Sequence, residues 1–92
     1  DYTKYPQSGE INFTVPDRTQ MIAQIRQVYN SAQIDEIDGL TFWYDDWWFN
    51  LRASKTEPLL RLNIEANNED MLAQKTQGLV SRLEGWGASR KT

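Results

Sequence analysis

Five segments of the chain have the pattern of β-strands, with apolar side chains at every second position or in short runs. The clearest segment is 59–66, where apolar residues at 60, 62 and 64 alternate with polar residues at 61, 63 and 65. Because successive side chains of a strand point to opposite faces of a sheet, this segment predicts one buried and one open face. The predicted strands cover residues 10–15, 33–37, 40–44, 47–52 and 59–66.

Two other segments have the 3.6-residue spacing of amphipathic helices. Asp17 can cap the first helix, with Gln20 three residues later, and this helix should end near residues 30–31. Asn67 or Asn68 can cap the second, and Gly85 is the predicted stop. The apolar stripes consist of Met21, Ile22, Ile25, Val28 and Tyr29 in the first helix, and of Met71, Leu72, Leu79, Val80 and Leu83 in the second.

The order of these elements, β-α-β-β-β-β-α, predicts an α+β fold in which two helices pack on one face of a mostly antiparallel sheet. Asp38-Gly39 predicts a two-residue type I′ hairpin turn, and Asp45-Asp46 a second tight turn. Residues 1–9 read as an extended interdomain linker, residues 10–85 as one folded domain, and residues 86–92 as a flexible tail.

The amino-acid composition of the chain excludes several classes of function and of binding site. The chain contains no Cys and no His, so disulfides, thiolate metal sites and the commonest general base are absent. The net charge of −3 argues against a nucleic-acid partner, which usually requires a basic excess. No apolar run is long enough for a membrane span and no signal peptide is evident, so we expect a cytoplasmic protein without a membrane partner.

The segment richest in chemistry is 50–66, NLRASKTEPLLRLNIEA, where basic and hydroxyl residues cluster between two predicted strands. A phosphate group is bound by guanidinium forks, hydroxyl donors and converging backbone N–H groups. Arg52, Ser54, Lys55 and Thr56 supply such groups, and Arg61 follows on the polar face of the next strand. On residue type alone the segment also fits an ordinary polar loop with solvated charges.

The same segment resembles the phosphate-binding loop in the last domain of the α-D-phosphohexomutases, whose pattern is roughly Arg-x-Ser-Asn-Thr-x-Pro followed by a strand. The resemblance extends to residues 8–12, 38–40, 48–52 and 60–66, in the same order along the chain. It is greatest to the phosphomannomutase/phosphoglucomutase branch, whose domain has a TATA-binding-protein-like fold. One departure is Lys55, which stands where the family usually has Asn.

By this resemblance, the parent protein is an isomerase that interconverts hexose 1-phosphate and hexose 6-phosphate of mannose or glucose. An enzyme phosphoserine donates the phosphoryl group and Mg²⁺ assists. The resemblance assigns the phosphoserine, the metal ligands and the sugar-recognition loop to the other domains of the mutase, so no catalytic or metal-binding residue is expected in this chain. Its role would be to hold the phosphate that is not transferred, through Arg52, Ser54, Lys55, Thr56 and Arg61, and to help close the active site.

The aromatic run 42–49 admits a further interpretation. Alternation assigns Phe42, Phe49 and Tyr44 to the core, whereas Trp43 and Trp48 should point to the other face, beside Arg52. Exposed rings next to basic residues also occur in small nucleic-acid-binding modules, which is the alternative function, although the acidic balance opposes it. Packing against other domains, or a purely protein-docking role, is the third possibility.

Overall fold

The computed structural model describes residues 5–37, 39–54 and 57–90, and within them six strands and two helices. They are β1 (Ile11–Thr14), α1 (Arg18–Val28), β2 (Gln33–Asp35), β3 (Leu40–Trp43), β4 (Trp47–Ala53), β5 (Leu59–Ala66), α2 (Glu69–Gly85) and β6 (Ser89–Arg90). The α+β prediction is therefore confirmed, with one short strand added at the end. Both predicted N-caps are present, since Asp17 accepts from the Gln20 amide and Asn68 from the Met71 amide.

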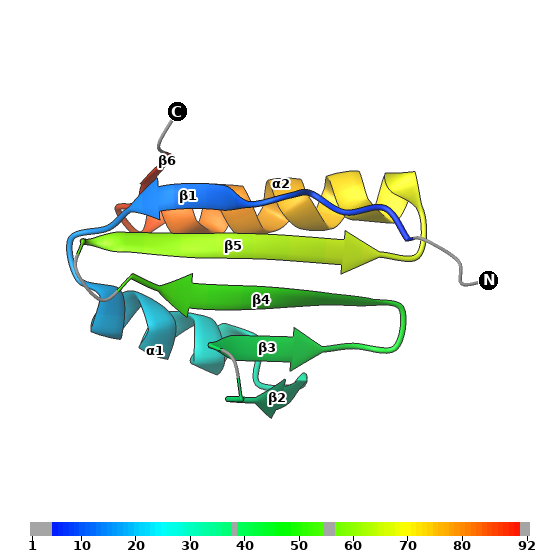
Figure 1. Cartoon of the computed structure of the whole chain (residues 1–92), viewed down its shortest axis with the longest axis horizontal. Helices are drawn as coiled ribbons and strands as arrows, with labels where there is room; N and C mark the ends of the chain where they lie inside the picture. The colour runs from blue at the N-terminus through cyan, green and yellow to red at the C-terminus, as the bar shows by residue number, and fades with distance from the viewer. Residues whose placement is uncertain (1–4, 38, 55–56, 91–92) are drawn as a thin grey trace.

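The strands form one antiparallel sheet in the order β2-β3-β4-β5-β1-β6, and both helices lie against the same face of it (Figure 1). Strands β4 and β5 lie at the centre and pair over seven residues, from Trp47↔Ala66 to Ala53↔Leu60. The loop that joins β4 to β5 therefore lies at one end of this central pair of strands.

The face of the sheet against the helices forms the core. Phe13, Phe42, Phe49, Leu60 and Leu62 are fully buried there, together with Ile25 of α1 and Leu79 and Leu83 of α2. The predicted division of the aromatic run is confirmed. The rings of Phe42 and Phe49 stack at 4.5 Å in the core, whereas Trp43 and Trp48 pair on the opposite face. Val28, predicted on the apolar stripe of the first helix, is 41% exposed because α1 ends there.

The hairpin between β2 and β3 is present, but the prediction of a two-residue turn is wrong. Asp35 pairs with Thr41, and this register is one residue out of step with a turn of residues 38 and 39, which requires Ile37 to pair with Leu40. Strand β2 therefore ends at Asp35, and Ile37 is 92% exposed. Gly39 has a φ of +71°, a conformation typical of the glycine in longer hairpin loops, and Asp38 lies outside the described residues.

The end of the second helix also differs from the prediction. Gly85 is still helical, Trp86 is the C-cap, and Gly87 adopts the left-handed conformation with a φ of +110°. The amide of Ala88 donates to the Leu83 carbonyl and that of Gly87 to the Glu84 carbonyl, which is the Schellman pattern. This turn directs the chain back onto the sheet, where Ser89 and Arg90 pair with β1. The sequence pattern predicts no strand in this tail.

Residues 6–8, which precede β1, follow the edge of β5. The Ser8 amide donates to the Ile64 carbonyl, the Ser8 hydroxyl accepts from the Ile64 amide, and the Ala66 amide donates to the Pro6 carbonyl. These bonds continue the hydrogen-bonding edge of β5 beyond β1.

Candidate functional site

The two arginines singled out in the sequence lie next to each other. Arg52 of β4 and Arg61 of β5 are direct cross-strand partners, and both are exposed on the face of the sheet that points away from the helices. We call this the outer face; its residues on the two central strands are Trp48, Asn50, Arg52, Arg61, Asn63 and Glu65. Side chains directly opposite on antiparallel strands are within reach of each other, so the two guanidinium groups present a local concentration of positive charge.

The β4–β5 loop, residues 54–58, begins two residues after Arg52 and ends three residues before Arg61. The Ser54 amide donates to the Leu59 carbonyl at 3.0 Å, and the Ser54 hydroxyl accepts from the Glu57 amide at 3.3 Å. A third bond runs from the Leu59 amide to the Glu57 carbonyl at 2.7 Å. Ser54 thus links the two described ends of the loop. Lys55 and Thr56 lie outside the described residues.

Arg18 is a contributor to this region that the sequence analysis missed. It is the first residue of α1, and its Nη1 donates to the Glu57 carbonyl at 2.9 Å. Three residues before Arg18, the Val15 amide donates to the Pro58 carbonyl at 3.0 Å. The end of the β4–β5 loop is therefore fixed by the segment that joins β1 to α1. The residues in these contacts are about forty positions apart in the sequence. A pattern of neighbouring residues therefore cannot predict them.

Glu10 is a second residue that the sequence analysis did not assign to the site. Its Oε2 lies 3.1 Å from Nε of Arg61, and both side chains are about half exposed. Glu10 directly precedes β1, the neighbour of β5, so the pairing of β1 with β5 places its carboxylate beside the arginine.

Gly39 positions the other arginine. A Cβ atom at residue 39 would lie 2.7 Å from Cγ of Arg52 and 2.9 Å from the Leu51 carbonyl oxygen, closer than real Cβ atoms approach. The β2–β3 turn therefore packs directly on the backbone of Arg52. Glycine is required here both by the contact and by its positive φ.

Farther along, the outer face carries indole rings, carboxamides and the carboxylate of Glu65. Trp43 and Trp48 are cross-strand partners with ring centroids 5.3 Å apart, and Nε1 of Trp43 donates to Oδ2 of Asp35 at 2.8 Å. Beside them, Nδ2 of Asn50 donates to Oγ1 of Thr41 at 3.0 Å. The prediction that Trp48 lies on the same face as Arg52 is confirmed by the register.

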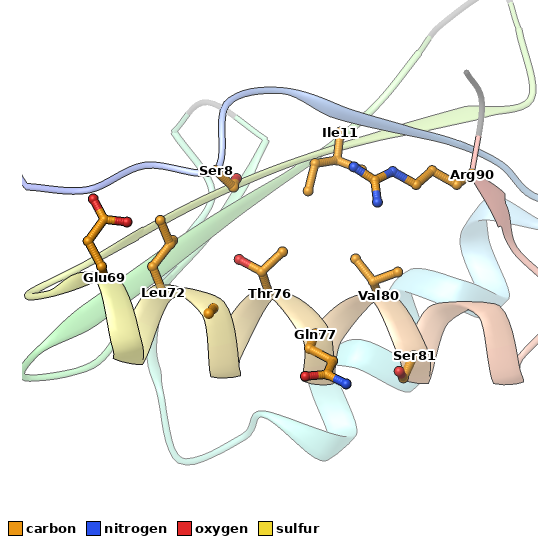
Figure 2. Close-up of a pocket in the computed structure, with 10 residues that line it drawn as sticks. Ser8, Ile11, Glu69, Leu72, Thr76, Gln77, Val80, Ser81 and Arg90 are labelled. Atoms are coloured by element: carbon orange, nitrogen blue, oxygen red, sulfur yellow. The ribbon is translucent and has the colours of Figure 1, made fainter.

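A groove of about 470 Å³ lies elsewhere, between α2 and the edge of the sheet (Figure 2). Leu72, Thr76 and Val80 of the helix line one side, and Ile11 and Arg90 line the other. Oγ1 of Thr76 is buried without a hydrogen-bond partner. Of the predicted phosphate-site residues that the structure describes, Arg52, Ser54 and Arg61, none lines this groove.

The described residues contain no group of three or more His, Cys, Asp or Glu side chains that could hold a metal ion. Over the same residues, neither helix is long and apolar enough to cross a membrane.

Comparison with known proteins places the chain in a family. Residues 10–83 match the family described as phosphoglucomutase/phosphomannomutase, C-terminal domain. A phosphomannomutase of Methanocaldococcus jannaschii is 40% identical over 87 residues, which cover 91% of this chain and 19% of that protein. A phosphohexose mutase of Xanthomonas campestris is 42% identical over 85 residues, covering 89% and 19%. A phosphomannomutase of Escherichia coli is 41% identical over 83 residues, covering 87% and 18%.

The matched region thus extends over most of this chain and about a fifth of the length of these relatives. It includes both arginines and the β4–β5 loop. With the α+β architecture and its sheet order also established, the chain belongs to the family of phosphoglucomutase/phosphomannomutase C-terminal domains.

Proposed function

We propose that this chain is the part of a phosphohexomutase that holds the non-transferred phosphate of a hexose phosphate and helps to close the active site. The parent enzyme would be an isomerase that interconverts the 1-phosphate and 6-phosphate of mannose or glucose. Arg52, Ser54 and Arg61 would contact the phosphate. Lys55 and Thr56 are also proposed to contact the phosphate, on the basis of the loop sequence alone.

The observation that carries the proposal is the direct pairing of Arg52 with Arg61 on the open outer face. Positive side chains directly opposite each other on a sheet repel. An anion bound between them would attract both side chains and offset that repulsion. Guanidinium groups bind phosphate oxygens through paired N–H donors, which gives both strength and orientation. Their exposure leaves access for a ligand that arrives from outside the domain.

The described ends of the β4–β5 loop support the same ligand because hydrogen bonds hold them in place before binding. Three hydrogen bonds within the loop and its strands, together with those from Arg18 and Val15, hold Ser54, Glu57 and Pro58 in place. Residues that are already held in place lose little conformational entropy when they bind the phosphate.

Holding a distant phosphate contributes to catalysis indirectly. Binding energy from a group that does not react can be used to orient the reacting end of the substrate. The described residues offer no cluster that fits Mg²⁺, so we assign the metal and the phosphoserine to other domains of the parent. The chain alone should therefore have no mutase activity and should bind sugar phosphates weakly.

The proposal is tested by following the backbone amides of the isotope-labelled chain by NMR during titration with mannose 1-phosphate, glucose 1-phosphate and inorganic phosphate. All three ligands should shift the amides of residues 52–61. Arg52→Gln and Arg61→Gln should each weaken binding about tenfold or more, as expected for the loss of one charge-assisted contact. Arg26→Gln is the matched control, because Arg26 is an equally exposed arginine paired with Glu36 on another part of the surface.

A coupled enzyme assay for mutase turnover on the same sample tests the second part. Turnover by the 92-residue chain would contradict the assignment of the catalytic groups to other domains. Binding that is unchanged in Arg52→Gln and Arg61→Gln would contradict the phosphate site itself. Because the outer face also carries aromatic rings, single-stranded RNA is included as a competitor, and the proposal predicts that it does not displace the sugar phosphate.

A further inference from the structure

The outer face contains a hollow that the phosphate site does not use. It has a volume of about 300 Å³ and is lined by Gln7, Thr41, Trp43, Trp48, Asn50 and Asn63. We propose that this hollow binds the pyranose ring of the sugar whose phosphate is held by Arg52 and Arg61. The proposal rests on the proposed function, and it adds a sugar subsite on this domain.

The two indoles supply an apolar surface of the right kind. The ring centroids of Trp43 and Trp48 are 5.3 Å apart and their planes are inclined at 40°. Trp43 is 43% exposed, and its bond to Asp35 fixes the orientation of its ring. A pyranose has a face of C–H groups that carry slight positive charge, and the face of an aromatic ring is negative. Tryptophan faces therefore bind such rings without requiring charge.

The remaining lining residues are neutral donors and acceptors. Gln7, Asn50 and Asn63 carry carboxamides, and Thr41 carries a hydroxyl. Carboxamides offer donors and acceptors together, as do the hydroxyl groups of a sugar. The bond from Asn50 to Thr41 orients these two polar groups relative to each other. A hollow with aromatic walls and a few placed polar groups is the usual composition of a small-ligand site.

The spacing between the hollow and the arginines suits a single phosphorylated sugar. Asn50 and Asn63 are cross-strand partners, as are Arg52 and Arg61. The two pairs are two residues apart on both strands and lie on the same face, which corresponds to about 6.5–7 Å along the sheet. Trp48 lies a further two residues along β4. A phosphate at the arginines would therefore place the attached ring over the two asparagines, with its far edge toward the indoles.

The surrounding charges favour a neutral ring over a second anionic group. Asp35 contacts Trp43, and Glu65 is the cross-strand partner of Trp48. Asp45, Asp46 and Glu65 also line an adjoining hollow that shares both tryptophans. Carboxylates accept hydrogen bonds from sugar hydroxyls and repel phosphodiesters. A polynucleotide stacked on these rings would meet this repulsion along its backbone, whereas a single sugar phosphate places its one anionic group at the arginines.

The test compares three ligands that share a phosphate: inorganic phosphate, methyl phosphate and glucose 1-phosphate. All three should shift the amides of the arginine pair and the β4–β5 loop. Glucose 1-phosphate alone should also shift the indole N–H signals of Trp43 and Trp48, and it should bind about tenfold tighter than methyl phosphate, equivalent to one or two net hydrogen bonds. The indole signal of Trp86, which packs against the core and lines neither of these two hollows, serves as the internal reference.

Variants separate the sugar subsite from the phosphate site. Trp48→Ala and Asn63→Ala should abolish the advantage of glucose 1-phosphate and leave the affinity for methyl phosphate unchanged. Trp48→Phe should retain part of that advantage, because it keeps an aromatic face, and Val28→Ala is a control for loss of an exposed apolar group.

Equal affinities for the three ligands, with shifts confined to residues 52–61, would overturn the sugar subsite and leave the phosphate site standing. Indole shifts of equal size with methyl phosphate would overturn it as well. An absence of shifts with every phosphate ligand would overturn the proposed function together with this inference.

Discussion

The two faces of the sheet are built from the same strands and yet differ in almost every property. On the inner face, residues 49 and 51 of β4 and residues 60, 62 and 64 of β5 are almost completely buried. On the outer face, their immediate neighbours in sequence are indoles, amides and guanidinium groups that are exposed or only partly buried. A single step along the chain moves a residue from one environment to the other.

The comparison separates stability from binding within one pair of strands. Burial of apolar area acts on the free energy of folding, and the inner face holds most of it. The outer face adds little to the core, so its composition can follow the demands of a ligand. Substitutions on the inner face should therefore change mainly the free energy of unfolding, and those on the outer face mainly ligand binding.

The largest effect is expected from Phe49→Ala on the inner face. Phe49 is fully buried, stacks on Phe42, and contacts Tyr29 and Trp47. Its loss should lower the free energy of unfolding by about 3–5 kcal/mol, measured by urea denaturation. The matched change on the outer face is Asn50→Ala, one residue away, for which the loss of the bond to Thr41 should cost about 1 kcal/mol. Equal losses for the two variants would contradict the division between the faces.

A smaller effect is expected from Gly39→Ala, which tests how the β2–β3 turn supports Arg52. The variant needs a positive φ and brings its Cβ against Arg52 and the Leu51 carbonyl, so the free energy of unfolding should fall by about 1–3 kcal/mol. Phosphate binding should weaken as Arg52 shifts. Gly78→Ala is the control with the opposite sign, because Gly78 is helical with open space around its Cα and should gain about 0.5–1 kcal/mol. An unchanged phosphate affinity in Gly39→Ala would show that the turn does not position the arginine.

The smallest effect is expected from Glu10→Gln, which removes a carboxylate that competes with phosphate for Arg61. The pair is about half exposed, and such pairs are worth a fraction of a kcal/mol to roughly 1 kcal/mol, so stability should change little. The affinity for inorganic phosphate, measured by NMR titration, should rise by a few-fold. Weaker binding in Glu10→Gln would instead mean that Glu10 orients Arg61 for the ligand.

Much of this division between the faces is predictable from alternation alone. The bounds of β5 agree with the pattern at 59–66, and the alternation of Phe42, Trp43, Trp48 and Phe49 assigns each ring to its correct face. The side-by-side arrangement of Arg52 and Arg61 also follows once the two strands are taken as neighbours. These features depend on the period of a strand, which a sequence carries directly.

Contacts between segments far apart in the chain were not predictable in this way. The bond from Arg18 to the Glu57 carbonyl and the pair of Glu10 with Arg61 both depend on where β1 is placed in the sheet. Strand β6 has two residues and therefore no period to detect, and its position depends on Gly87, two residues beyond the predicted helix stop. The two-residue hairpin was inferred from a dipeptide, whereas the pairing of Asp35 with Thr41 decides the turn.

The order of strand lengths across the sheet has a consequence for the behaviour of the protein at high concentration. The two outermost strands, β2 and β6, have three and two residues, whereas β4 and β5 at the centre have seven and eight. A long, flat outermost strand offers a row of unpaired N–H and C=O groups on which another molecule can add a strand, and very short ones offer few. The long strands therefore lie inside the sheet and not at its edges. The outer face can be open to a ligand while the sheet has little tendency toward edge-to-edge aggregation.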